Sequence, residues 1–137
     1  MIRTATNADI PELMRIRAAV QENRLRDPSR VPASAYQAFL AVSPIWLFED
    51  EGGIRGFAAA DPRDGSIWAL FTDPAAEGRG VGKALLSYAL NDLKQAGWEQ
   101  AHLSTDCGTR ADRFYRAQGW APTGLTEGGE QGFVRAL

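Results

Sequence analysis

The sequence predicts a single α/β (α+β) domain over residues 1–137, with a mixed, mostly antiparallel sheet flanked by helices. The length of 137 residues is enough for one full hydrophobic core but not for two. Apolar residues recur at helical spacing in the first third of the chain and at strand spacing after Pro44. A glycine-rich turn then leads from a strand into a long helix. The expected order of elements is β-α-α-β-β-β-α-β-α-β-β.

The first elements are a short strand and two helices. Residues Ile2 to Ala5 alternate between apolar and polar side chains, as in a strand. Thr6-Asn7-Ala8-Asp9 is a capping-box pattern that starts a helix, and Pro11 falls in its first turns, where a missing N–H costs little. Asp27-Pro28-Ser29 ends that helix, and a second helix is expected from Pro32 to Ala41.

Three strands in an antiparallel meander follow the helices. They are expected at Ile45 to Glu49, Ile54 to Ala60 and Ser66 to Thr72. Their connections, Asp50 to Gly53 and Asp61 to Gly65, are rich in turn-forming residues. Two tight connections between consecutive strands therefore predict neighbours in one sheet.

The second half of the chain mixes helices and strands. A long helix begins near Val81 and stops at Gly97, a residue type that commonly ends helices. The remaining elements are a strand at Ala101 to Thr105, a helix at Arg110 to Gln118, and strands at Trp120 to Leu125 and Gly132 to Leu137.

Composition excludes several classes of protein. The formal net charge is −2 and no basic run of five residues occurs, so nucleic acid is not an expected partner. Cys107 is the single cysteine, which rules out an intrachain disulfide and favours a reducing cytoplasm. We expect no signal peptide, no membrane-spanning segment and no metal site, because neither the apolar runs nor the ligand spacings that these need are present.

The most informative motif is the glycine-rich segment before the long helix. Gly78, Gly80 and Gly82 remove side chains from a helix N-terminus, so that backbone N–H groups can face an anion. Lys83 or Arg79 adds a cation. A pyrophosphate suits such a site, and the alternative is a tight turn that binds nothing.

Three phosphate-binding loops can be compared with this segment. The nucleotide P-loop fails at Glu77 and Ala84, and the dinucleotide fingerprint fails at Lys83. The acetyl-CoA loop, [QR]-x-x-G-x-[GA], matches at Gly80 and Gly82, with Glu77 in place of Gln or Arg. The acetyl-CoA loop is therefore the best match.

With these features the chain resembles the GNAT superfamily of acetyl-CoA-dependent N-acetyltransferases. The resemblance covers nearly the whole length and includes Ile2 to Thr6, Phe71 to Pro74, Gly78 to Leu86 and Arg110 to Trp120. It implies direct transfer of an acetyl group from acetyl-CoA to an amine of a small molecule, peptide or protein. It also implies that the loop amides bind the pyrophosphate and that the pantetheine arm enters between two parallel central strands. Many members are homodimers, and the sequence itself identifies no interface.

The resemblance implies a set of residues that contact acetyl-CoA. They are Leu70, Phe71, Thr72, Gly78, Arg79, Gly80, Val81, Gly82, Lys83 and Tyr115. Backbone groups at the end of the fourth strand would hold the pantetheine and the thioester carbonyl. Tyr115 would protonate the departing thiolate, since a phenol is protonated at neutral pH; the alternative is a core tyrosine. Gly108 stands where the family often has Asn.

The sequence does not identify a single general base. Many relatives have a Glu on the fourth strand, but Ser66 to Thr72 contains no carboxylate. Glu22, Asp106 and His102 are candidates, and a chain of water molecules is another. Asp106 is also expected to cap the helix that follows it. Cys107 has no histidine at motif spacing and is taken as a bystander.

The acceptor pocket is expected to involve Glu22, Asn23 and Trp68. A solvated helix end is the alternative for Glu22, and a core position is the alternative for Trp68. The missing fourth-strand carboxylate and Gly108 motivate a second hypothesis, an acyl-CoA-binding sensor without useful catalysis. A third is action on a partner protein, at its N-terminus or a lysine.

Overall fold

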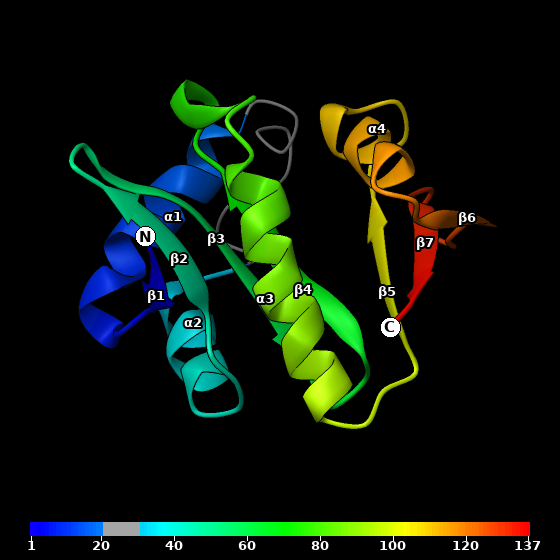
Figure 1. Cartoon of the computed structure of the whole chain (residues 1–137), viewed down its shortest axis with the longest axis horizontal. Coiled ribbons are helices and arrows are strands. Elements are labelled where there is room, and N and C mark those ends of the chain that lie inside the picture. Colours follow the sequence, from blue (N-terminus) through cyan, green and yellow to red (C-terminus); the bar gives the residue numbers. More distant parts are fainter. Residues whose placement is uncertain (21–30) are drawn as a thin grey trace.

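Seven strands form one sheet in the computed structural model, which describes residues 1–20 and 31–137 (Figure 1). The strands are β1 (Ile2–Thr4), β2 (Trp46–Asp50), β3 (Gly53–Asp61), β4 (Ser66–Thr72), β5 (Gln100–Thr105), β6 (Ala121–Leu125) and β7 (Gln131–Ala136). Their order across the sheet is β1-β2-β3-β4-β5-β7-β6. Neighbouring strands are antiparallel except β4 and β5, which are parallel. The mixed, mostly antiparallel sheet expected from the sequence is confirmed.

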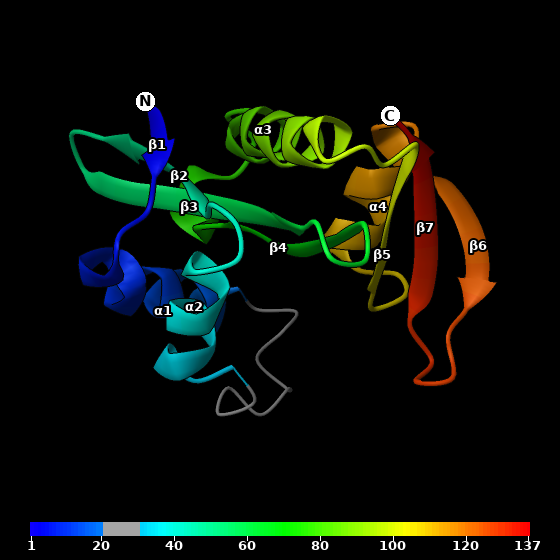
Figure 2. The same ribbon diagram turned by 90° about the horizontal axis from the view of Figure 1, so that it is seen from below.

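Helices cover both faces of this sheet. They are α1 (Ile10–Ala19), α2 (Ala33–Leu40), α3 (Val81–Gln95) and α4 (Arg110–Ala117). Figure 2 shows α1 and α2 on one face of the meander strands and α3 on the other. The order of helices and strands agrees with the sequence prediction, with short 3-10 turns added at Asn7–Asp9 and Pro74–Ala76. Among the described residues, no helix combines the length and the apolar character needed to cross a bilayer.

Strand β3 explains why both faces need helices. Phe57 and Ala59 point into the core beneath α1 and α2, whereas Ala58 and Ala60 point into the core beneath α3. All four are fully buried. Residues 57–60 of the strand therefore form a continuous apolar run, because successive side chains alternate between two covered faces.

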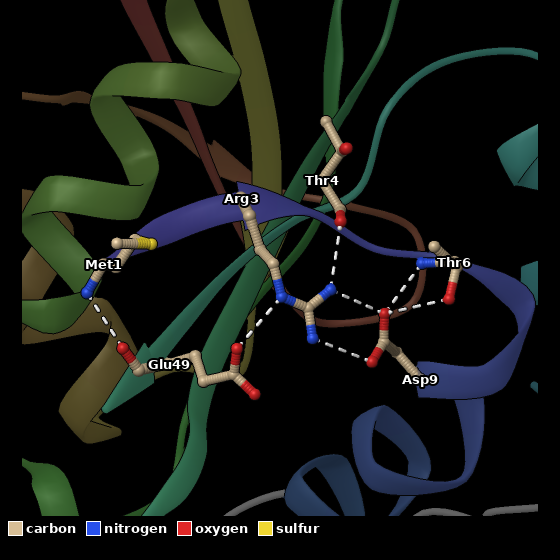
Figure 3. A network of polar contacts seen from close by, with 6 residues as sticks. All are labelled: Met1, Arg3, Thr4, Thr6, Asp9 and Glu49. Atoms are coloured by element: carbon tan, nitrogen blue, oxygen red, sulfur yellow. Dashed lines mark hydrogen bonds and ion pairs between the residues drawn. The ribbon is translucent and has the colours of Figure 1, made fainter. Parts of the chain in front are cut away.

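Arg3 organises the N-terminal corner of the fold (Figure 3). Its Nη1 and Nη2 donate to the two carboxylate oxygens of Asp9 at 2.9 and 3.0 Å, and its Nε donates to Glu49 on β2 at 3.0 Å. Asp9 also accepts the N–H of Thr6 at 2.8 Å, in the capping box expected from the sequence. The bond from Arg3 is the main reason that the pKa of Asp9 falls to about 2. One guanidinium thus ties β1, β2 and the start of α1 together.

The parallel strands β4 and β5 separate along their length. Their backbone register pairs Ser66 with His102, and the His102 N–H donates to the Gly65 carbonyl at 3.1 Å. Beyond that point the two strands diverge, as Figure 1 shows. The sheet is therefore open between the carboxyl ends of β4 and β5, and this opening positions the candidate site.

Candidate active site

A cavity of about 500 Å³ lies at the opening between β4 and β5. Among the described residues, five segments form its wall: the end of α1, the end of β4, the loop and first turn of α3, the end of β5, and α4. It contains all the residues expected to contact acetyl-CoA except Arg79, namely Leu70, Phe71, Thr72, Gly78, Gly80, Val81, Gly82, Lys83 and Tyr115. Residues far apart in sequence are thus brought together around one hollow.

Glycines shape the N-terminus of α3 where it faces the cavity. Gly80 is the N-cap residue and has φ of 79°, a left-handed conformation that other residues rarely adopt. A side chain at Gly82 would approach the Thr72 hydroxyl to 3.3 Å, so glycine lets α3 start close to the end of β4. The first N–H groups of a helix have no partner within the helix, and its dipole favours negative charge. This end of α3 is accordingly suited to an anion.

The end of β4 presents backbone groups to the opening. The Asp73 N–H donates to the Arg55 carbonyl at 2.8 Å, on the β3 side of the strand. Successive residues of a strand direct their backbone groups to opposite sides. Leu70 and Thr72 therefore direct theirs toward β5, where the opening removes the neighbouring strand.

Tyr115 lies in the wall of the cavity from α4. Its side chain is 6% exposed and makes an edge contact with the Trp120 ring, with 5.4 Å between centroids. Burial raises the pKa of the phenol above its ordinary value. The hydroxyl therefore keeps its proton throughout the neutral range and is available as a donor.

Charged side chains are divided between the cavity and its surroundings. Lys83 lines the cavity, whereas the Arg79 guanidinium lies 3.2 Å from Asp50, outside the cavity wall. Glu77 and Arg110 both line the cavity, and their side chains approach to 3.4 Å. Of the two cations considered from the sequence, Lys83 lines the cavity and Arg79 does not, and Arg110 from α4 lines it as well.

Two of the candidate bases differ in their positions. Asp106 lies in the cavity wall at the end of β5. His102 is exposed beside the β4–β5 pairing point, with a ring nitrogen 2.9 Å from the Asp64 carbonyl, so it is not part of the cavity. Glu22 falls outside the described residues, as does Asn23. No cluster of His, Cys, Asp or Glu that suits a metal occurs among the described residues.

Trp68 belongs to the core instead of the cavity wall. Its ring stacks on Phe39 with centroids 4.2 Å apart and makes an edge contact with Tyr36 at 5.4 Å. This packing agrees with the alternative of a core indole, and the expectation that Trp68 lines the acceptor pocket stays a prediction. Its strand position alone could not separate these two roles, because both faces of β4 are covered.

The start of α4 corrects another expectation. The N-cap residue is Thr109, whose hydroxyl oxygen accepts the Asp112 N–H at 3.2 Å, so Asp106 is not the cap. Gly108 has φ of 71°, and its N–H donates to Asp112 at 2.8 Å. Glycine at this position thus belongs to the turn that leads into α4.

Sequence reasoning missed the contribution of α4 apart from Tyr115. Arg110, Phe114 and Gln118 also line the cavity. They are spaced four residues apart and share one face of the helix. That periodicity was a usable signal, but only the structure shows that this face looks onto the opening.

Comparison with known proteins gives a family for this architecture. The acetyltransferase (GNAT) domain family matches residues 41–122. The mycothiol acetyltransferase of Beutenbergia cavernae is 33% identical over 89 residues, which cover 61% of this chain and 30% of that protein. The chain thus spans less than a third of the length of this relative.

Other similarities extend over more of the chain. The peptidyl-lysine N-acetyltransferase YiaC of Escherichia coli is 28% identical over 132 residues, covering 88% of this chain and 82% of that protein. The crystal structure of the PaiA N-acetyltransferase from Thermoplasma acidophilum, in complex with coenzyme A, has a TM-score of 0.86. It is 13% identical, with 100% of this chain and 98% of that chain covered, so it establishes likeness of fold.

Proposed function

This chain belongs to the GNAT family of acetyltransferases, and we propose that it transfers the acetyl group of acetyl-CoA directly to an amine. One observation carries the proposal. The glycine-shaped N-terminus of α3, the open edge of β4 and the protonated phenol of Tyr115 line one cavity. An anion site, a carbonyl site and an acid are the parts that this transfer needs.

Acetyl-CoA is assigned to the cavity by its charge and shape. The pyrophosphate is placed at the backbone N–H groups of Gly78 to Gly82, where the helix dipole and the Lys83 ammonium favour negative charge. The pantetheine arm is placed between β4 and β5, along the backbone groups of Leu70 and Thr72. A CoA complex of a protein with the same fold supports this assignment.

The transfer itself needs a neutral amine, because an ammonium has no lone pair. The amine nitrogen attacks the thioester carbon, and the negative charge that develops on the carbonyl oxygen meets backbone N–H groups at the end of β4. The carbon–sulfur bond then breaks, and Tyr115 gives its proton to the departing thiolate. The proton that the new amide nitrogen loses passes to water or to a carboxylate.

The base in this scheme is assigned by position. Asp106 is proposed as the carboxylate nearest the reaction, since it lies in the cavity wall at the end of β5. Glu22, outside the described residues, stays an alternative from sequence, as does a chain of water molecules. The pH dependence of the Asp106→Asn variant separates them, because loss of the base moves the rate toward dependence on hydroxide.

Two relatives are named for different classes of acceptor. One is named for mycothiol acetylation and another for peptidyl-lysine acetylation, so a small molecule and a protein amine are both represented. We propose an amine acceptor in either class, in the reducing cytoplasm that a single cysteine favours. A homodimer, common in the family, stays a prediction.

The test begins with ligand binding. Acetyl-CoA and CoA should raise the melting temperature of the purified protein, and ATP should not, because binding to the native state stabilises it. Lys83→Gln should lower the apparent affinity for acetyl-CoA about 3- to 10-fold and so reduce the rise in melting temperature. Lys94→Gln, which removes the other lysine from the far end of the same helix, should leave it unchanged.

Turnover is then measured as CoA release with a panel of amines. Release that depends on an amine supports the transferase. Binding of acetyl-CoA without release by any amine would favour a sensor. If neither acetyl-CoA nor CoA raises the melting temperature, the result would contradict the proposal.

A further inference from the structure

Arg17, on the α1 side of the sheet, contacts Phe71, a residue of the cavity wall. It occupies the last turn of that helix, and its guanidinium carbon is 4.6 Å from the centroid of the Phe71 ring. Phe71 lines the cavity, and so does Val20 at the end of α1. The guanidinium is thus placed over an aromatic wall of the proposed site, on the face of the sheet opposite α3.

Charge pairing distinguishes Arg17 from its neighbour on the same helix. Arg15 donates to Glu12 at 2.8 Å and to Asp73 at 3.2 Å. Within residues 1–20 and 31–137, Arg17 forms no ion pair with a carboxylate. A guanidinium stacked on a ring keeps the N–H groups of its edge directed outward, in the fork that matches a carboxylate.

A second polar side chain, that of Tyr36, lies beside Arg17. The Tyr36 side chain is fully buried, and its hydroxyl donates no hydrogen bond to a described residue. Burial raises the pKa of Tyr36, and both the charge of Arg17 and a hydrogen bond from its side chain oppose that rise, as expected for neighbouring groups. A buried hydroxyl that donates to no acceptor is costly, and a carboxylate oxygen is an acceptor that both groups can use.

We propose that Arg17 binds a carboxylate of the acceptor, and that the acceptor is a small amine with a carboxylate close to its amino group, such as a free amino acid. This inference rests on the proposed acetyl transfer. Phe71, which supports Arg17, belongs to the β4 segment that is proposed to hold the thioester. An anion held at Arg17 is therefore near the reacting carbon and close to the attacking nitrogen.

The position of the anion decides between classes of acceptor. A free α-amino acid carries its carboxylate one carbon from the amine. The N-terminus of a protein carries an amide in place of that carboxylate, and an amide does not form the charged pair. The carbon beside a lysine ε-amine carries neither group. Arg17 thus favours the small acceptor over the protein acceptor.

The experiment compares acids with their amides. The acceptors are L-alanine, L-methionine, L-phenylalanine and L-glutamate, each with its α-carboxamide, and the readout is kcat/KM for the acetylated product by mass spectrometry. The wild type should prefer the acids, and Arg17→Gln should lower kcat/KM for the acids by about 10- to 100-fold while changing the amides little. Arg17→Lys should restore part of the loss. Arg15→Gln, from the same helix, is the matched control and should keep the preference.

A binding measurement keeps this test separate from the proposed function. Titration of the CoA-loaded protein with the N-acetylated acids and their carboxamides measures the same discrimination without turnover. If the protein turns over no acceptor but binds the N-acetyl acids through Arg17, the acetyl transfer fails and the carboxylate site stands. Equal binding of acids and amides, or equal losses for both in Arg17→Gln, would overturn the inference.

Discussion

The Glu77 carboxylate lies 3.4 Å from the Arg110 guanidinium, and both residues line the cavity. Glu77 precedes the glycine loop, and Arg110 is the first residue of α4. The acetyl-CoA loop pattern has Gln or Arg at the position of Glu77, so a negative charge there opposes a phosphate. Arg110 offsets this charge from a different part of the chain. The unusual Glu77 in the loop and Arg110 on α4 therefore form a compensating charge pair.

This pair predicts opposite effects of two single substitutions. Arg110→Gln should weaken acetyl-CoA binding about tenfold, because it leaves Glu77 uncompensated near the phosphates. Glu77→Gln should strengthen binding about 2- to 5-fold, because it removes a negative charge near the phosphates. Isothermal titration of both single variants and the double variant measures the coupling. Effects that simply add, with no coupling between the two sites, would contradict the arrangement.

Removal of the Tyr115 hydroxyl should separate chemistry from binding. We expect Tyr115→Phe to lower kcat by about 10- to 100-fold and to leave acetyl-CoA affinity within about twofold, since the ring and its packing stay. Tyr88→Phe, at an exposed tyrosine of α3, should change neither quantity. Because burial raises the pKa of Tyr115, the wild-type rate should not fall between pH 8 and about 10 through loss of this proton. An unchanged kcat for Tyr115→Phe at every pH would remove its role as the acid.

The loop glycine Gly80 should tolerate no side chain. Its φ of 79° makes Gly80→Ala strained, and we expect a loss of about 1 kcal/mol of unfolding free energy together with weaker acetyl-CoA binding. Gly128→Ala is the control, because the nearest atom to its added Cβ is 3.8 Å away and its φ is not left-handed. Urea unfolding and CoA titration test both effects. Equal behaviour of the two alanine variants would show that the loop conformation is not constrained.

Asp9 should make stability depend on acidic pH. Its pKa falls from 3.8 to about 2 on folding, so its contribution is complete above about pH 4 and is lost as the pH falls through about 2. The contribution should be about 1 kcal/mol, because Arg3 is partly exposed and water screens the pair. Asp9→Asn should lower the unfolding free energy by that amount at pH 7 and flatten the loss between pH 4 and 2. Chemical unfolding across this range measures it, with Glu127→Gln at an exposed site as the control. If the unfolding free energy of Asp9→Asn fell with pH as steeply as that of the wild type, the result would contradict the role given to Asp9.

Local patterns in the sequence were enough to predict the elements and the loop. The capping box at Thr6, the strand from Ser66 to Thr72 and the stop of α3 before Gly97 depend on interactions within a few residues, and the structure has all three. Family membership, predicted from the loop and the helix around Tyr115, is confirmed. The roles of the site residues stay predictions.

The sequence by itself determined the two periodicities, the turns and the glycines that shape the start of α3, because these follow from backbone preferences and the alternation of apolar side chains. Only the tertiary structure decided which side chains meet. In the structure, Trp68 packs on Phe39 and Arg79 pairs with Asp50. Arg110 lies beside Glu77, and Arg17 lies over the Phe71 ring. The physical reason is that β4 and β5 diverge after a single paired position, and no local pattern encodes the opening between them.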